Sequence, residues 1–185
     1  GISHFLEHML FKGTPTLSPE EIAQVFDGLG GEVNAATGKD YTVLYCRVLD
    51  ELVDRGMPVL TDMLQRPTLA DLDQERVVLE EIAMYEDDPQ DQIHDLASVA
   101  VFPDQALGRP VIGTAQVIGS VPADGVRAYH DGHYTAPNNV VAAAGNITHE
   151  RVVELADELL GDLPREPGAG VYEAARPGSP TLVVK

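Results

Sequence analysis

Three residues able to bind and use a metal ion lie close together near the start of the chain. His4, Glu7 and His8 belong to the run HFLEH. On a helix, positions i and i+4 share one face with Cβ atoms about 5–6 Å apart, so both imidazoles can reach one zinc ion through bonds of about 2.0–2.1 Å. Glu7 projects toward the same side. Because zinc lowers the pKa of bound water to about 7, a carboxylate beside that water can accept its proton. The pattern therefore predicts a zinc site suited to amide hydrolysis.

The order H-x-x-E-H reverses the H-E-x-x-H pattern of many zinc peptidases and corresponds to the inverzincin signature. Taken alone it is moderately specific, since three fixed positions match by chance in about one chain in a hundred. The alternative interpretation is two helix histidines and a surface glutamate. The motif also supplies only two protein ligands, whereas a catalytic zinc usually has three.

The strongest candidate for the third ligand lies in QERVVLEEIAMYE, within a helix expected over residues 70–87. On a helical wheel, five apolar residues share an arc of about 160°, with Glu81 in its middle and Glu80 at its edge. A carboxylate in the middle of an apolar face is costly unless it is paired or metal-bound. We therefore expect Glu81 to be the third ligand, with an ion pair to an arginine as the alternative. The five apolar residues are Val77, Val78, Ile82, Met84 and Tyr85.

The elements that position these residues indicate an α+β fold, with a mixed or antiparallel sheet packed against helices. Ser18 is a good N-cap and Pro19 suits the first position of a helix that ends near Gly30. Pro58 predicts a kink or break within its helix. The remaining expected elements are two strands around a turn at 37–40, helices over 50–65, 90–102, 122–134 and from Thr148, a punctuated loop over 103–120, and a buried strand over 138–147.

The domain organisation expected from composition is one catalytic domain over residues 1–163, followed by a linker over 164–180. The linker is rich in proline and glycine, which is typical of such segments. Residues 181–185, TLVVK, have the pattern of a strand that begins another domain. We expect the chain to be a fragment truncated at both ends, with strands missing before Gly1.

Composition excludes several classes of partner. The chain has 30 acidic residues and 12 Lys plus Arg, a net charge of −18, which repels phosphate backbones and argues against nucleic acid. The charge favours basic peptides or cations, although solubility alone would also explain it. No apolar run has the length of a membrane span. The lone Cys46, expected in the core, cannot form an internal disulfide, which favours a reducing compartment such as the cytoplasm.

Two further groups of candidate ligands are weaker. His130 and His133 are an i, i+3 pair, for which a second metal site is conceivable but not favoured. Asp87, Asp88 and Asp91 form an acidic cluster, but it lacks the glycine and bidentate glutamate of a calcium loop. We expect that cluster to be a solvated helix junction.

Five ordered segments resemble one known family, the pitrilysin/insulinase zinc peptidases, over nearly the whole chain. They are HFLEHMLFKGT, GGEVNAATGKDYTVLYCRV, VVLEEIAMYEDDPQD, LGRPVIGT and HYTAPNNVVAAAGNI. The resemblance is greatest to the branch that contains mitochondrial processing peptidase β subunits and their bacterial relatives. One departure is the spacing from His8 to Glu81, which is a few residues shorter than usual in the family.

The resemblance implies the catalytic half of a two-half pitrilysin-type fold, with one zinc held by His4, His8 and Glu81 and with Glu7 as general base. It also implies that an extended peptide pairs with an exposed strand edge near Asn34 and Ala35. A second homologous half, in the same chain or in a partner subunit, would complete the substrate chamber.

The function expected is therefore that of a zinc endopeptidase acting on extended or unfolded peptides, with the fragment alone inactive. One alternative is an inactive structural subunit of the same family. Another, of a different class, is an acidic binding module with an incidental zinc.

Overall fold

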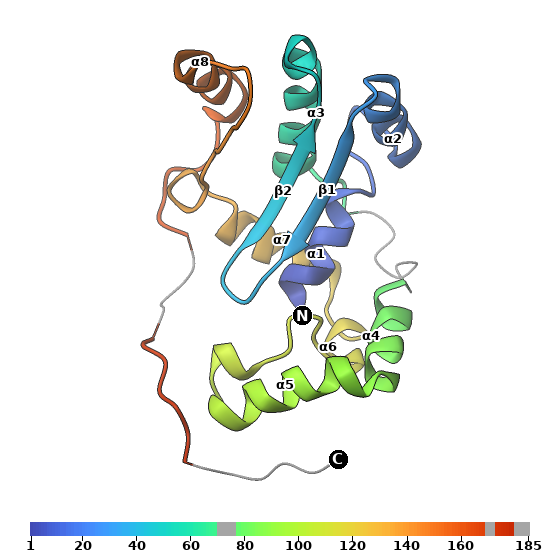
Figure 1. Cartoon of the computed structure of the whole chain (residues 1–185), viewed down its shortest axis with the longest axis vertical. Coiled ribbons are helices and arrows are strands. Elements are labelled where there is room, and N and C mark those ends of the chain that lie inside the picture. The colour runs from blue at the N-terminus through green and yellow to red at the C-terminus, as the bar shows by residue number, and fades with distance from the viewer. Residues whose placement is uncertain (70–76, 169–172, 180–185) are drawn as a thin grey trace.

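The structure is a computed structural model of the chain and describes residues 1–69, 77–168 and 173–179. It is α+β, as predicted: an antiparallel hairpin of two strands has helices packed along one of its faces (Figure 1). The strands are β1 (Glu32–Thr37) and β2 (Thr42–Arg47). The helices are α1 (Ile2–Leu10), α2 (Pro19–Gly28), α3 (Val53–Gln65), α4 (Val77–Asp87), α5 (Pro89–Val101), α6 (Ala115–Ile118), α7 (Ala123–His133) and α8 (His149–Leu160).

Helix α1 is amphipathic, and its apolar face forms the centre of the main core. Phe5, Leu6, Met9 and Leu10 of this helix are all buried. They pack with side chains from α4, α6 and α7, among them Val78, Ile82, Ile118 and Val126. Burial of this face fixes the rotation of α1, so its polar face is directed toward the hairpin, which the helix also contacts.

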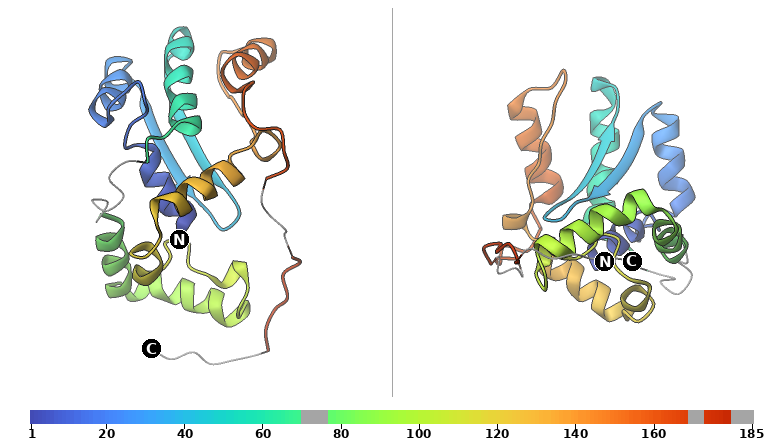
Figure 2. Two further views of the ribbon diagram at one scale, coloured as in Figure 1. Left: turned by 180° about the vertical axis from the view of Figure 1, so that it is seen from behind. Right: turned by 60° about the horizontal axis from the view of Figure 1, so that its bottom comes forward.

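A second core joins α2 and α3 to one face of the hairpin. It consists of Ile22, Phe26, Leu29 and Met63, with Cys46 half-buried against it. Burial raises the pKa of the Cys46 thiol, consistent with the predicted core position. Helix α3 lies between α2 and α8, as the two views of Figure 2 show.

Helix α2 begins as the sequence predicts. The Ser18 hydroxyl accepts a hydrogen bond from the N–H of Glu21, and the Glu21 carboxylate accepts one from the N–H of Ser18. This capping box satisfies two backbone donors that the first helical turn leaves unpaired. Pro19 occupies the first helical position, as expected.

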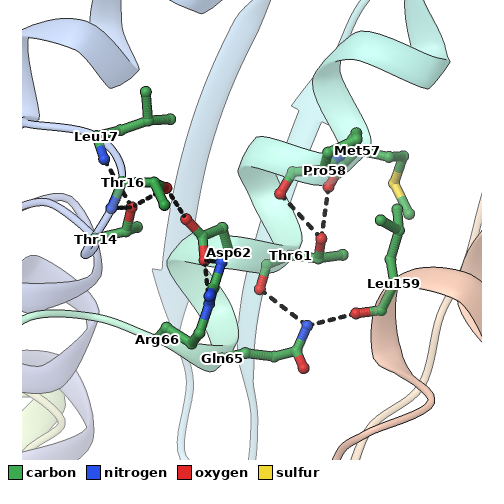
Figure 3. A network of polar contacts seen from close by, with 10 residues as sticks. All are labelled: Thr14, Thr16, Leu17, Met57, Pro58, Thr61, Asp62, Gln65, Arg66 and Leu159. Carbon is green, nitrogen blue, oxygen red and sulfur yellow. Dashed lines mark hydrogen bonds and ion pairs between the residues drawn. The ribbon is translucent and has the colours of Figure 1, made fainter.

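A buried carboxylate ties the loop that follows α1 to α3 (Figure 3). Asp62 is 8% exposed and accepts hydrogen bonds from the Thr16 hydroxyl at 2.7 Å and from Arg66 Nε at 2.6 Å. Burial alone would raise the pKa of Asp62, but hydrogen bonds from Thr14, Thr16 and Arg66 outweigh it and lower that pKa. The network therefore keeps Asp62 ionised and restrains the loop that follows α1.

Two of the expected features differ in the structure. The strand predicted over 138–147 is wrong: these residues form no strand, and Val140 is 92% exposed. In the part of the chain that is described, β1 pairs only with β2, so no neighbouring strand offers this apolar run a hydrogen-bonding ladder. Of the kink or break expected at Pro58, the break does not occur, because α3 continues through the proline from Val53 to Gln65.

The remaining expectations are met in part. The helix predicted over 70–87 is observed from Val77 to Asp87, and its first part lies outside the described residues. The loop over 103–120 contains the short helix α6. Residues 164–168 and 173–179 have no helix or strand, and residues 181–185 lie outside the description. Among the helices that the structure describes, none has the length and apolar character needed to cross a membrane.

Candidate metal centre

Helix α1 presents His4, Glu7 and His8 on the face opposite its buried apolar residues. The two imidazole rings have centroids 4.8 Å apart and meet edge to face at 72°. Their side chains are 13% and 24% exposed, for His4 and His8 respectively. The local i, i+4 spacing thus produces two adjacent, partly accessible nitrogen ligands, as the sequence predicts.

Helix α4 brings Glu81 to the same place. Glu81 Oε2 lies 3.7 Å from His4 Nε2 and 3.4 Å from His8 Nε2. Of the described residues, these three form the single group of His, Cys, Asp or Glu side chains that converge closely enough to hold a metal ion, with all ligand atoms within 4.8 Å of one another. The shorter spacing between His8 and Glu81 therefore does not prevent their approach.

The geometry fits a zinc ion. Two ligands on a tetrahedral zinc, each at about 2.0–2.1 Å, lie about 3.3 Å apart, close to both observed separations. Burial lowers the pKa of His4 more than the negative charge of Glu81 raises it, and so favours the neutral ring that a metal requires. His4 Nδ1 is buried and has no hydrogen-bond partner among the described residues, which leaves Nε2 as the nitrogen directed toward the shared point.

The surroundings of Glu81 differ from the predicted apolar arc. Val78 and Ile82 are buried, but Val77 and Met84 are 53% and 73% exposed. Helix α4 packs on the core through the narrow Val78–Ile82 stripe, so Glu81 lies at the border of the buried face rather than in its middle. Glu80 is exposed, and the helical register that distinguishes the two glutamates agrees with the prediction.

Two of the candidate ligands, His4 and Glu81, line a cavity between α1, β1, α4 and α5. Besides His4, Glu7 and Glu81, its lining includes Tyr85, which the sequence placed on the apolar arc of α4, and Asp95, which the sequence did not single out. Burial raises the pKa of Tyr85, and the negative charges of Asp91, Asp95 and Glu81 raise it further. The cavity wall is therefore acidic. The remaining lining residues are Ala36, Thr37, Val111 and Ile112.

Strand β1 lies along this cavity. Asn34 is exposed and Ala35 half-buried, and neither lines the cavity, whereas the next two residues of the strand do. The backbone N–H of Ala35 donates to Asn34 Oδ1 at 2.8 Å. In the described part of the chain β1 has a partner strand on one side alone, since its register pairs it with β2. The structure thus brings the predicted peptide-binding residues next to the candidate metal centre.

The carboxylate of Glu7 also contacts β1, because the hydroxyl of Thr37 donates a hydrogen bond to Glu7 Oε2. Sequence analysis did not identify Thr37. The only available signal was its place at the end of the NAAT segment, three residues after Asn34.

The other candidate ligands have different roles. The His130 ring is hydrogen-bonded at both nitrogens, to Asp131 Oδ1 at 3.1 Å and to the carbonyl of Leu64 at 2.8 Å. It therefore forms no metal group with His133 in the described residues. Asp88 caps α5 by accepting a bond from the N–H of Gln90, which accounts for one member of the acidic cluster at the α4–α5 junction.

Comparison with known proteins identifies the family. The sequence profile of the insulinase family (peptidase family M16) matches residues 1–115, and the profile described as the peptidase M16 inactive domain matches residues 120–185. A Streptomyces coelicolor protein named as an uncharacterized zinc protease is 47% identical over 83% of this chain and 34% of its own length. The Bacillus subtilis uncharacterized zinc protease YmxG is 44% identical over 94% of this chain and 41% of its own length.

Solved structures agree on the fold. A protease from Helicobacter pylori superposes with a TM-score of 0.86 at 20% identity, over 96% of this chain and 44% of that one. A peptidase M16 inactive domain from Pseudomonas fluorescens gives a TM-score of 0.85 at 21% identity, over 97% of this chain and 44% of that one. The chain spans 34% and 41% of the lengths of the two curated relatives described above. It is a member of the insulinase family of peptidases, M16, and covers part of the length of its relatives.

Proposed function

We propose that this chain forms the catalytic centre of a zinc endopeptidase that hydrolyses extended or unfolded peptides. The observation that carries the proposal is the convergence of His4, His8 and Glu81 ligand atoms within 4.8 Å, beside a cavity that Glu7 also lines. The names of the relatives, zinc proteases, support the use of zinc. One zinc per chain is expected, because the described residues contain one such group.

When bound, zinc would supply a Lewis acid that polarises the peptide carbonyl and acidifies the attacking water. His4, His8 and Glu81 would hold it, leaving a fourth position open to the cavity. Glu7, on the same face of α1, would accept the proton of the water as it attacks the carbonyl carbon. Glu7 would then return that proton to the leaving amine, which separates as the C–N bond breaks.

The substrate would bind along β1. An extended peptide that pairs with the unpartnered edge of a strand gains main-chain hydrogen bonds irrespective of its side chains. Asn34 and Ala35 lie on this strand, and Ala36 and Thr37 continue it into the cavity. To pair at Ala35, the peptide would replace the local bond between the N–H of Ala35 and Asn34 Oδ1. The acidic cavity wall and the net charge of −18 favour peptides with basic residues.

The complete chamber requires more than this chain. Since the chain spans about two fifths or less of the two relatives' length, we propose that a second half, in the same polypeptide or a partner, contributes further peptide contacts. Turnover is therefore expected of the full-length protein rather than of residues 1–185 alone.

The test is cleavage of an internally quenched, unstructured peptide by the full-length protein, with and without a chelator and with zinc added back. If the protein is a peptidase, it cleaves the peptide, the chelator abolishes the cleavage and added zinc restores it. The matched His8→Ala variant stays inactive under all three conditions. If the protein binds zinc and peptide but never cleaves, it is an inactive partner subunit. If it binds zinc without any peptide, it is an acidic module with an incidental metal. Either of the last two results contradicts the proposal.

A further inference from the structure

Glu7 is held by a chain of hydroxyl groups that sequence analysis did not reveal. Its Oε2 accepts a hydrogen bond from the Thr37 hydroxyl. The Thr37 and Thr42 hydroxyl oxygens lie 3.3 Å apart. Thr42 begins β2, so the two threonines connect the candidate base on α1 to both strands of the hairpin.

The direction of these bonds follows from the chemistry of the groups. An ionised carboxylate only accepts hydrogen bonds, so Thr37 must donate its single proton to Glu7. The bond between the two threonines then requires Thr42 to donate to Thr37.

The hairpin that carries the two threonines is packed on the main core. Thr37 and Thr42 are directly opposite each other, as the last residue of β1 and the first of β2, and such cross-strand pairs stabilise a hairpin. Leu44 of β2 packs against the main core, to which α1 contributes its apolar face. The donor that reaches Glu7 is therefore fixed relative to the helix that carries Glu7.

We propose that Thr37 is a positioning residue: its hydroxyl, oriented by Thr42, holds one carboxylate oxygen of Glu7 so that the other faces the attacking water. The inference rests on the proposed function, because it assigns the base of that reaction a fixed orientation. A glutamate side chain has several rotatable bonds, and a general base must lie about 2.6–3.2 Å from the proton that it abstracts. Displacement of a reacting group by about 1 Å can cost about 10²-fold in rate.

The experiment compares Thr37→Val with Thr37→Ser in the full-length protein. Valine keeps the β-branched shape but removes the donor, so kcat should fall about 10–100-fold, while KM and bound zinc stay within about twofold of wild type. Serine restores the donor and should recover kcat to within about threefold. Thr42→Val breaks only the second link and should give a smaller loss than Thr37→Val.

A second readout does not depend on turnover. In the infrared spectrum of the zinc-free protein, the carboxylate stretching band of Glu7 is the band that disappears in Glu7→Gln. That band should shift in Thr37→Val, where the carboxylate loses its donor, and return in Thr37→Ser. A band that stays unchanged in Thr37→Val overturns the inference.

The kinetic results distinguish a failure of the Thr37 proposal from a failure of the proposed peptidase function. If Glu7→Gln is inactive but Thr37→Val turns over normally, Thr37 does not position the base and the peptidase assignment stands. Equal loss in the valine and serine variants, or loss of zinc in Thr37→Val, makes Thr37 a structural residue and also overturns the inference. If Glu7→Gln itself turns over normally, the proposed function fails.

Discussion

Replacement of Glu81 by alanine should weaken zinc binding far more than replacement of its neighbour Glu80. Glu81 Oε2 lies 3.4 Å from His8 Nε2 and 3.7 Å from His4 Nε2, whereas Glu80 is exposed and takes no part in the group of candidate ligands. The two variants are matched, because each replaces a glutamate in α4 with a residue of high helix propensity.

The magnitude follows from the number of ligands. A structural zinc site of four ligands binds with about 10–16 kcal/mol, or about 2.5–4 kcal/mol for each ligand. Because about 1.4 kcal/mol corresponds to a factor of ten, Glu81→Ala should raise the zinc Kd about 10²–10³-fold. Glu80→Ala should change it less than about twofold.

The assay is competition for zinc between the metal-free protein and a chromogenic chelator of known affinity, with circular dichroism to check that both variants are folded. A Kd for Glu81→Ala within tenfold of wild type would refute the assignment of this ligand. A larger effect for Glu80→Ala than for Glu81→Ala would show that the register of α4 at the metal is wrong.

Three further predictions concern the surroundings of the centre. In Ala35→Pro the proline removes the backbone N–H that now donates to Asn34 Oδ1, so KM for an extended peptide should rise while bound zinc is unchanged; an unaltered KM would exclude pairing at this residue. Asp62→Asn should reduce the free energy of unfolding by about 1–3 kcal/mol near neutral pH. Because the pKa of Asp62 is lowered in the folded state, the stability difference between wild type and variant should persist above the unfolded pKa of about 3.9 and disappear as the pH falls through the folded pKa. Thermal melts from pH 7 to 2 measure it. A stability difference that persists at pH 2 contradicts the prediction. Asp95 lines the cavity, where its carboxylate would attract a basic side chain of the peptide. Asp95→Asn should therefore weaken binding of an arginine-containing peptide about two- to fivefold relative to the same peptide with alanine in place of arginine. Equal changes for both peptides would show that Asp95 does not bind the arginine.

The parts of the site that the sequence predicted are those fixed by short-range geometry. His4 and His8 converge because the i, i+4 spacing of any helix brings such residues together. The N-cap at Ser18 and the hairpin turn after Thr37, which the sequence also predicted, are likewise local. The approach of Glu81 to the two histidines matches the expectation although its surroundings do not, since which side chains of α4 are buried depends on where α1 and α6 pack against it.

The features that were missed depend on contacts between distant segments. Val140 and Val141 have the composition of a buried strand, but an apolar run becomes a strand only where another strand lies beside it, and in the described structure β1 and β2 pair only with each other. The hydrogen bond from Thr37 to Glu7 joins the end of β1 to α1, and nothing in the spacing of the two residues indicates it. Asp95 reaches the cavity from α5 for the same kind of reason.

The central claim is that Glu7 acts as the base of a zinc-dependent hydrolysis rather than as a ligand or a structural residue. The most direct test is the zinc content and peptide turnover of full-length Glu7→Gln beside wild type. Glutamine keeps nearly the same volume and can still accept the hydrogen bond from Thr37, but it cannot take a proton. We predict an unchanged zinc content and KM, with kcat reduced at least about 10²–10⁴-fold, the usual contribution of general base catalysis. Full zinc occupancy with near-normal turnover would contradict the account, and loss of zinc would make Glu7 part of the metal site instead.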